Sequence, residues 1–143
     1  LILDMAGNTG TQSLAVTIRV ISNEQTTKKD VAKLILKELK VGLLNGLIIG
    51  SISFCVVLLF LMIVKSKDAG MIYNLKIATS IGISMLASII VANAAGTIIP
   101  VIFKKCKVDP AVASGPLITT LNDIIAVSIY YGLAWILFKT LIG

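Results

Sequence analysis

The sequence has 143 residues, of which 57% are hydrophobic and 14% charged, and its mean hydropathy of +0.98 argues against a soluble globular domain. Its formal net charge of +6 would suit nucleic acid, but no aromatic residues are interleaved with the lysines, so no nucleic-acid partner is expected. Histidine is absent and no cysteine cluster exists, which argues against zinc, redox and catalytic sites and predicts that the protein is not an enzyme.

Four apolar segments follow one another along the chain and predict an all-α, polytopic transmembrane bundle with four helices in this chain. The first pass, Met5–Ile21, begins almost at the start of the sequence, so we expect an upstream part that this sequence lacks. Val41–Val64 and Ile77–Phe103 contain no charged residue, and each exceeds the roughly 20 residues that cross a ~30 Å hydrocarbon layer. Pro110–Phe138 is interrupted by one charge, Asp123.

The lysines gather in the connections between these segments. The first connection carries Lys28, Lys29, Lys33, Lys37 and Lys40, the second Lys65, Lys67 and Lys76, and the third Lys104, Lys105 and Lys107. Cytoplasmic loops of membrane proteins carry an excess of basic residues. The distribution therefore predicts a multi-pass protein of the cell membrane, with connections 22–40 and 104–109 cytoplasmic and the C-terminus outside.

The first connection also carries a helix-start signal. Thr27-x-x-Asp30 resembles a capping box, and the apolar residues after it fall on one side of a helix. This predicts a short interfacial helix that feeds the next pass, with its lysines facing lipid head groups or a soluble domain. A solvated helix face is the open alternative.

Small residues recur at every fourth position in two of the expected passes. They are Gly42, Gly46 and Gly50 in one pass, and Ser80, Ser84, Ser88, Ala92 and Gly96 in the other. In lipid, such stripes let helix backbones approach closely, so we interpret both as structural. Asn93 is expected to form interhelical hydrogen bonds, with a place near an ion path as the alternative, and Pro100 is expected to kink its helix.

Asp123 is an ionisable residue inside an expected pass. A carboxylate there costs about 2.5–3.5 kcal/mol on insertion scales, so it usually faces a bundle interior or a water-filled cavity. Thr119 stands one turn before it, and Gly115-Pro116 should start the helix late and leave carbonyls free to face a cavity. A protonated or hydrogen-bonded structural aspartate is the alternative.

The first pass contains a matching anomaly. Ala6–Gln12 is rich in glycine and uncharged polar residues, including Gly7 and Asn8, and Asp4 stands just before it. Such a run can line an aqueous path with amide, hydroxyl and carbonyl oxygens, although a glycine-mediated helix crossing is the alternative. A phosphate cradle is not expected, because the run lacks a P-loop lysine.

The chemistry of these residues can be matched to an ion. The candidate ligands are Asp123, Thr119, Asn8, Gly7, Asp4 and Gly115. They offer oxygens alone, which favour a hard cation, and Mg²⁺ requires octahedral oxygen and gives up its water reluctantly. Asp123 is the one carboxylate of this set inside an expected pass, and its neighbours there are neutral oxygens, which predicts a hydrated ion recognised through its water shell. Two chains would place two Asp123 carboxylates around a divalent ion, which is a reason to expect a homodimer.

The same motifs resemble a known family. Asp109–Asp123, with the sequence DPAVASGPLITTLND, is followed by Ile129-Tyr130-Tyr131 and resembles the last transmembrane helix of MgtE magnesium transporters and their animal solute-carrier relatives. Leu3–Ser13, with the sequence LDMAGNTGTQS, resembles their second helix, and Ala92–Pro100 fits their fourth. The resemblance covers essentially the whole chain, so residues 1–143 are interpreted as one N-terminally truncated MgtE-like transmembrane domain.

This resemblance implies five transmembrane helices per subunit, the first of them missing here, and a homodimer whose pore is lined by the second and fifth. It implies that Asp123 recognises hydrated Mg²⁺, the transported ion, and that a cytosolic magnesium-sensing region with CBS modules precedes the membrane domain in bacterial members. Ala126 and Ala6 stand where the family favours glycine, which puts the fine ion selectivity in doubt.

The expected function is transport of magnesium across the plasma membrane through a pore at a homodimer interface. A carrier that exchanges divalent cations against Na⁺ or H⁺ would use the same residues. A structural membrane subunit without transport activity is the remaining alternative.

Overall fold

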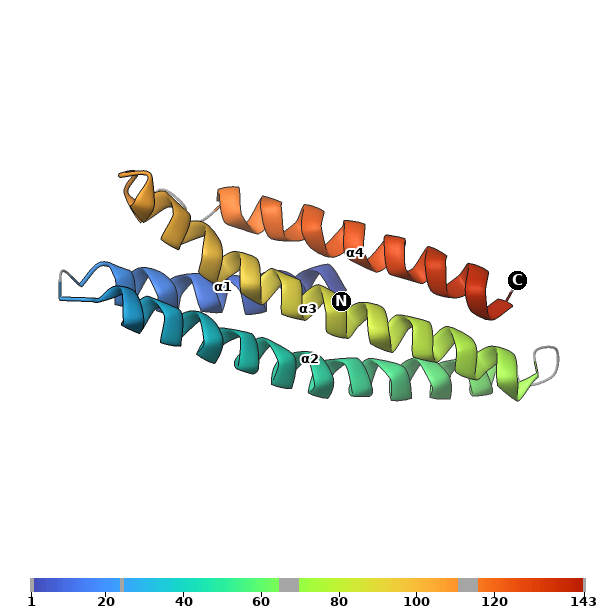
Figure 1. Cartoon of the computed structure of the whole chain (residues 1–143). Helices are drawn as coiled ribbons and strands as arrows, with labels where there is room; N and C mark the ends of the chain where they lie inside the picture. Colours follow the sequence, from blue (N-terminus) through green and yellow to red (C-terminus); the bar gives the residue numbers. More distant parts are fainter. Residues whose placement is uncertain (1, 24, 65–69, 111–115, 143) are drawn as a thin grey trace.

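The computed structural model describes residues 2–23, 25–64, 70–110 and 116–142 and arranges them in four long helices (Figure 1). These are α1 (Ile2–Ile21), α2 (Lys28–Val64), α3 (Met71–Lys105) and α4 (Pro116–Ile142). The residues described contain no strand. The prediction of an all-α helical bundle is confirmed.

Helix α3 lies at the centre of the bundle and packs against each of the other three helices (Figure 1). At 1.5 Å per residue, its 35 residues and the 37 of α2 are both longer than the ~30 Å hydrocarbon layer. Helix α1 has 20 residues and covers only part of the bundle length, beginning near its middle (Figure 1).

Within the described residues, α2, α3 and Thr119–Leu137 of α4 are long and apolar enough to cross a membrane. Helix α1, which we expected to be a further pass, falls outside this group. Its polar run from Ala6 to Gln12 explains the difference, because six of those seven positions hold glycine or an uncharged polar residue.

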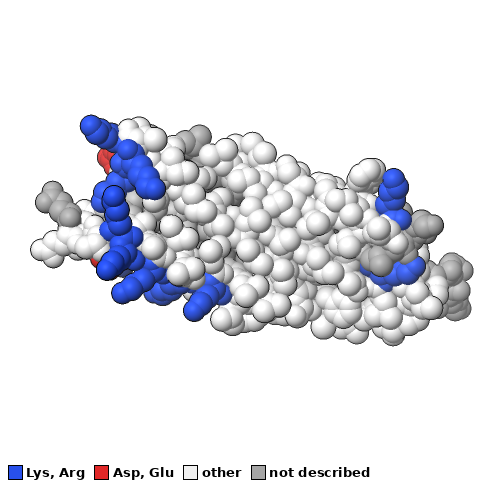
Figure 2. All heavy atoms as spheres, in the orientation of Figure 1, with Lys and Arg blue, Asp and Glu red and all other residues white. Residues whose placement is uncertain are grey.

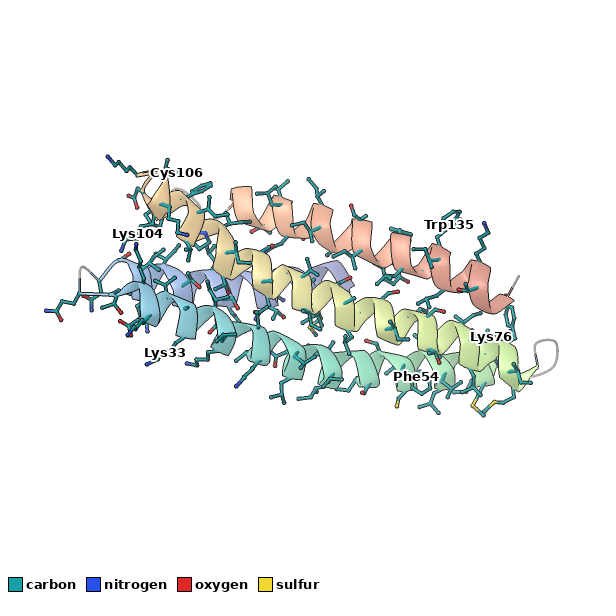
Figure 3. The ribbon with its side chains drawn as sticks, in the orientation of Figure 1. Lys33, Phe54, Lys76, Lys104, Cys106 and Trp135 are labelled. Carbon is teal, nitrogen blue, oxygen red and sulfur yellow. The ribbon has the colours of Figure 1, made fainter. Side chains whose placement is uncertain are left out.

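The surface has the charge pattern of a membrane protein. On the face shown in Figure 2, basic side chains gather at the two ends and leave a broad uncharged band between them. Lys33 and Lys104 mark one end, whereas Lys76 and Trp135 lie toward the other (Figure 3). Trp135 is 68% exposed and the Lys139 ammonium lies 5.7 Å from its ring centroid, as expected for residues at a membrane interface. The chain is a multi-pass membrane protein.

The glycine stripe of α2 packs on α3 within the chain. A Cβ added at Gly50 would lie 2.9 Å from the carbonyl oxygen of Gly82, and one at Gly46 would lie 3.1 Å from that of Leu86. The absence of side chains at these positions lets the two backbones approach closely. The structural interpretation of this stripe is confirmed.

The small residues of α3 face α1 and α4. Ser84, Ser88 and Ala92 are fully buried, and the Ser88 hydroxyl donates to the Ala126 carbonyl at 3.3 Å. Gly96 contacts the Gly10 carbonyl of α1 so closely that no Cβ could fit between them. This stripe is also structural, because it brings α1 against the central helix.

Two of the predicted helix starts are confirmed, and one prediction near the start of α2 is wrong. The Asp30 amide donates to Thr27 Oγ1 at 3.3 Å, and the Thr27 amide donates to Asp30 Oδ2 at 3.0 Å, which confirms the capping box. Pro116 is the first residue of α4, as a late start requires. The prediction of a short interfacial helix before the next pass was wrong. Helix α2 runs unbroken from Lys28, since no proline interrupts it and its glycines pack on α3.

Two further features shape the ends of α1 and α3. The Lys104 ammonium donates to the carbonyl of Ile21, the last residue of α1, where it satisfies a free carbonyl and meets the negative end of the helix dipole. Helix α3 continues through Pro100, and its last turns diverge from the direction of the rest of the helix (Figure 1). The ring removes one backbone hydrogen bond there.

The Gly10–Gly96 contact predicts a large stability effect. We expect Gly96→Ala to lower the free energy of unfolding of the detergent-solubilised protein by about 1–3 kcal/mol, because the new methyl group must push the α1 backbone away. Gly132→Ala is the matched control, since a Cβ there meets nothing within 4 Å. Equal melting temperatures for the two variants would contradict the close packing of α1 on α3.

Candidate cation site

A polar pocket of about 450 Å³ lies between α1 and α4. Its lining residues share one face on each helix, because they are three or four residues apart along the chain. They are Asp4, Gly7, Asn8 and Thr11 from α1, and Thr119 and Asp123 from α4. The spacing of the sequence motifs therefore translates into one continuous polar surface.

Asp123 lies beside the backbone of α1. A Cβ added at Gly7 would lie 3.4 Å from Asp123 Oδ1, an ordinary van der Waals contact, so the carboxylate is next to this glycine. Gly7 is buried and Asp123 is half-buried. The carboxylate thus lies beside α1 and lines the pocket.

Thr11 supplies an acceptor to the same pocket. Its hydroxyl donates to the Gly7 carbonyl at 2.5 Å, with a second contact to the Asn8 carbonyl at 3.2 Å. A hydroxyl has one hydrogen and two lone pairs, so this oxygen can only accept from a pocket ligand. Thr11 lies in the polar run but was not among the predicted ligands, although its distance of seven residues from Asp4 would have indicated the shared face.

The pocket has the charge and the size for a hydrated cation. Two of its lining residues, Asp4 and Asp123, are acidic and none is basic. Six waters at about 30 Å³ each need about 180 Å³, so the pocket can hold an ion together with its water shell. Within the described residues no group of three His, Cys, Asp or Glu side chains could hold a metal directly.

Asn122 anchors α4 behind the pocket. It is fully buried, and a Cβ added at Gly10 would overlap its side-chain amide. The Asn122 side chain therefore fills the gap that Gly10 leaves in α1. Because neighbouring residues on a helix point about 100° apart, this contact sets the rotation that turns Asp123 toward the pocket.

The two departures from the family pattern lie away from the pocket lining. Ala6 and Ala126 are both fully buried and pack with Ala92 in one small apolar cluster. They come from α1, α4 and α3, and none of the three lines the pocket. The methyl groups fill the contact between the helices that carry the site.

Asn93 forms the interhelical hydrogen bonds that we expected. It is buried, its side-chain oxygen contacts the Ser13 hydroxyl of α1, and its side-chain nitrogen donates to the Glu38 carbonyl of α2. The Ser13 hydroxyl also lies 2.7 Å from Glu38 Oε2. Glu38 was not predicted to be buried. One indication of it was present, since Glu38 is an acidic residue among lysines and lies four positions before Gly42.

Of the predicted ligands, the structure brings together Asp4, Gly7, Asn8, Thr119 and Asp123 around one pocket. Gly115 lies outside the described residues. The ligand role of all six residues stays a prediction, because the structure shows only that the five described ones share a pocket.

Comparison with known proteins adds an independent observation. The family model of MgtE, a divalent cation transporter, matches residues 1–133. The chain is 42% identical over 130 residues to a magnesium transporter MgtE of Bacillus subtilis, 42% over 134 residues to that of Enterococcus faecalis, and 32% over 138 residues to that of Thermus thermophilus.

These matches cover 91%, 94% and 96% of the chain but only 26%, 27% and 28% of the relatives. The chain thus spans about a quarter of the length of the curated relatives that it matches. The match runs through all the helices that form the pocket, and the chain belongs to the MgtE family of divalent cation transporters.

Proposed function

We propose that this protein transports Mg²⁺ across the cell membrane and that the ion passes through the α1–α4 pocket with most of its water shell. The observation that carries the proposal is the Asp123 carboxylate beside Gly7 in a pocket that is acidic and large enough for a hydrated ion. The relatives named as magnesium transporters support the choice of ion.

The recognition follows from the chemistry of magnesium. Mg²⁺ holds its first-shell waters tightly at about 2.0–2.1 Å, so a site that accepts hydrogen bonds from those waters avoids the cost of removing them. Asp123 and Thr11 both present acceptors to the pocket. The carboxylate charge stabilises a divalent ion more than a monovalent one, which gives a basis for selectivity.

We further propose that two copies of the chain form the transport path. Asp4 and Asn8 line the pocket and are exposed, so the pocket opens toward the surface of this chain. A second copy placed across this opening would add a second Asp123 and balance the two charges of the ion. The chain spans about a quarter of its relatives' length, and we propose that the complete protein also has a further transmembrane helix and a cytosolic magnesium-sensing CBS region.

The first test removes the carboxylate. We expect Asp123→Asn to weaken Mg²⁺ affinity by about 10–100-fold, because a hydrogen bond to a charged group contributes roughly 1.5–3 kcal/mol. Asp4→Asn should cost less, because Asp4 is exposed and its charge is screened by water. The measurement is magnesium-dependent growth and uptake in a transport-deficient strain that carries the complete gene.

Asp30→Asn is the matched control, since it removes an exposed carboxylate that does not line the pocket. Asparagine can still accept from the Thr27 amide, so uptake should be unchanged. Membrane insertion of Asp123→Asn should equal that of the wild type. Unimpaired growth of the Asp123→Asn strain at limiting magnesium would refute the site and favour a structural subunit.

The second test concerns topology. In a protein without Cys55 and Cys106, we expect a cysteine at Lys105 to react with a membrane-impermeant reagent only from the cytoplasmic side. A cysteine at Lys139 should react only from outside, because Lys139 lies near the C-terminal end of α4. Labelling of position 105 in intact cells would overturn this orientation.

The third test concerns assembly. Asn8→Cys should form disulfide-linked dimers in membranes, because Asn8 lies at the opening of the pocket. Ile52→Cys is the control: it is 57% exposed on the apolar face of α2, where we expect lipid. Crosslinking at position 52 with none at position 8 would contradict this assembly, because the two chains would then meet through α2 and not at the pocket opening.

A further inference from the structure

A second pocket lies at the lysine-rich end of the bundle, apart from the cation pocket. Its volume is about 470 Å³, within the range of roughly 300–1,000 Å³ that is typical of ligand pockets. The connection after α1, the first turns of α2 and the last turns of α3 form its walls, and these three segments meet at one end of the bundle (Figure 1). It shares no lining residue with the pocket that contains Asp123.

The inner part of this second pocket is apolar. Val31 and Ile35 of α2 and Val101 of α3 line it and are half-buried. Helix α2 begins at this end of the bundle, so Ile35 lies about 10 Å closer to the middle than Lys28, at about 1.5 Å per residue. Helix α3 ends here, so Val101 likewise lies closer to the middle than Lys105. The lining is therefore apolar toward the membrane interior.

The outer part of the pocket is basic. Lys28, Lys104 and Lys105 line it, and within the described residues no acidic side chain does. The Lys104 ammonium donates to the Ile21 carbonyl, which places it at the pocket wall. Lys28 and Lys105 are exposed, so their ammonium groups can reach a ligand from α2 and from α3.

The carboxylate that lies closest along α2 is engaged in the capping box. Asp30 Oδ2 accepts from the Thr27 amide at 3.0 Å and from the Thr27 hydroxyl at 2.6 Å. Neither Asp30 nor Asp109, which follows α3, lines the pocket. The pocket therefore keeps its positive charge and suits an anion, and lysine ammonium groups bind phosphate as point charges.

The position of the pocket indicates which kind of anion it takes. On the face shown in Figure 2, the basic side chains of this end border the broad uncharged band, and Lys33 and Lys104 lie at this end in Figure 3. The pocket thus lies where lipid head groups meet acyl chains. A soluble phosphate compound would contact the lysines and leave the apolar part of the lining uncovered. An anionic phospholipid carries its charge and its chains in the same order as the lining, and basic pockets between transmembrane helices bind such head groups.

We propose that this pocket binds one anionic phospholipid, whose phosphate is held by Lys28 and Lys105 while the start of an acyl chain packs along Val31, Ile35 and Val101. The bound lipid joins the connection after α1 to α2 and α3, on the side of the bundle that is predicted to be cytoplasmic. Its binding does not depend on which ion passes through the α1–α4 pocket.

Native mass spectrometry of the complete protein in detergent tests this pocket without measuring transport. We expect dioleoyl phosphatidylglycerol to bind more tightly than dioleoyl phosphatidylcholine, which has the same chains and no net charge. Lys28→Gln combined with Lys105→Gln should weaken phosphatidylglycerol binding about 30-fold, because each lysine near a membrane surface contributes roughly fivefold. Lys33→Gln combined with Lys37→Gln is the matched control, since it removes the same charge from exposed lysines that do not line the pocket.

Ala32→Phe tests the shape of the pocket without changing its charge. Ala32 lines the pocket and is exposed, so the ring can enter the pocket without displacing buried side chains, and it should weaken phosphatidylglycerol binding about tenfold. Equal losses in the two double variants, or unchanged binding in Ala32→Phe, would overturn the proposal, because the lysines would then attract lipid by charge alone. Glycerol phosphate that bound as tightly as the lipid would also overturn it, since the pocket would then take a soluble phosphate. So would equal binding of the two lipids, the result expected if another part of the complete protein covers the pocket.

Discussion

The close approach of α1 to α3 is the contact on which the site depends. The Gly10 carbonyl lies against Gly96, and the side chain of Asn122 from α4 fills the space that Gly10 leaves on its other side. In a membrane, where lipid is as apolar as leucine, such contact between backbones is what holds helices together. Any residue larger than glycine at either position would separate the helices that carry the pocket.

Because of this packing, two faces of α1 have different surroundings. Ala6, Gly10 and Ser13 are buried between the helices, whereas Asp4, Asn8 and Thr11 line or edge the pocket. Because 3.6 residues make one turn, a single polar run can supply both a packing face and an ion-facing surface. The glycine-mediated crossing is seen on one face of the helix, and the aqueous lining stays a prediction for the face that borders the pocket.

The features that were predicted correctly are those with a large physical cost. An acidic residue in an apolar pass must face a cavity, and glycine stripes in lipid must pack, so Asp123 and Gly46 could be interpreted without a structure. Glu38 gave no such signal, since a glutamate among lysines is usually solvated. Its burial results from the continuous course of α2, which depends on packing against α3 rather than on local preference. Thr11 was not predicted as a pocket residue, because the polar run Ala6–Gln12 was considered as a whole and its helix faces were not separated.

The carboxylates of Asp123 and Glu38 have different surroundings. Asp123 faces a pocket with room for an ion and its water, so its charge can be balanced by the ligand. Glu38 is buried against the neighbouring helices, where its carboxylate accepts from the Ser13 hydroxyl and its backbone carbonyl accepts from the Asn93 amide. Both residues meet α1, which contacts Asp123 at Gly7 and Glu38 at Ser13. A shift of α1 that changes the contact between Ser13 and Glu38 must therefore also change the distance between Gly7 and the Asp123 carboxylate, because a helix moves as a rigid element over so few turns.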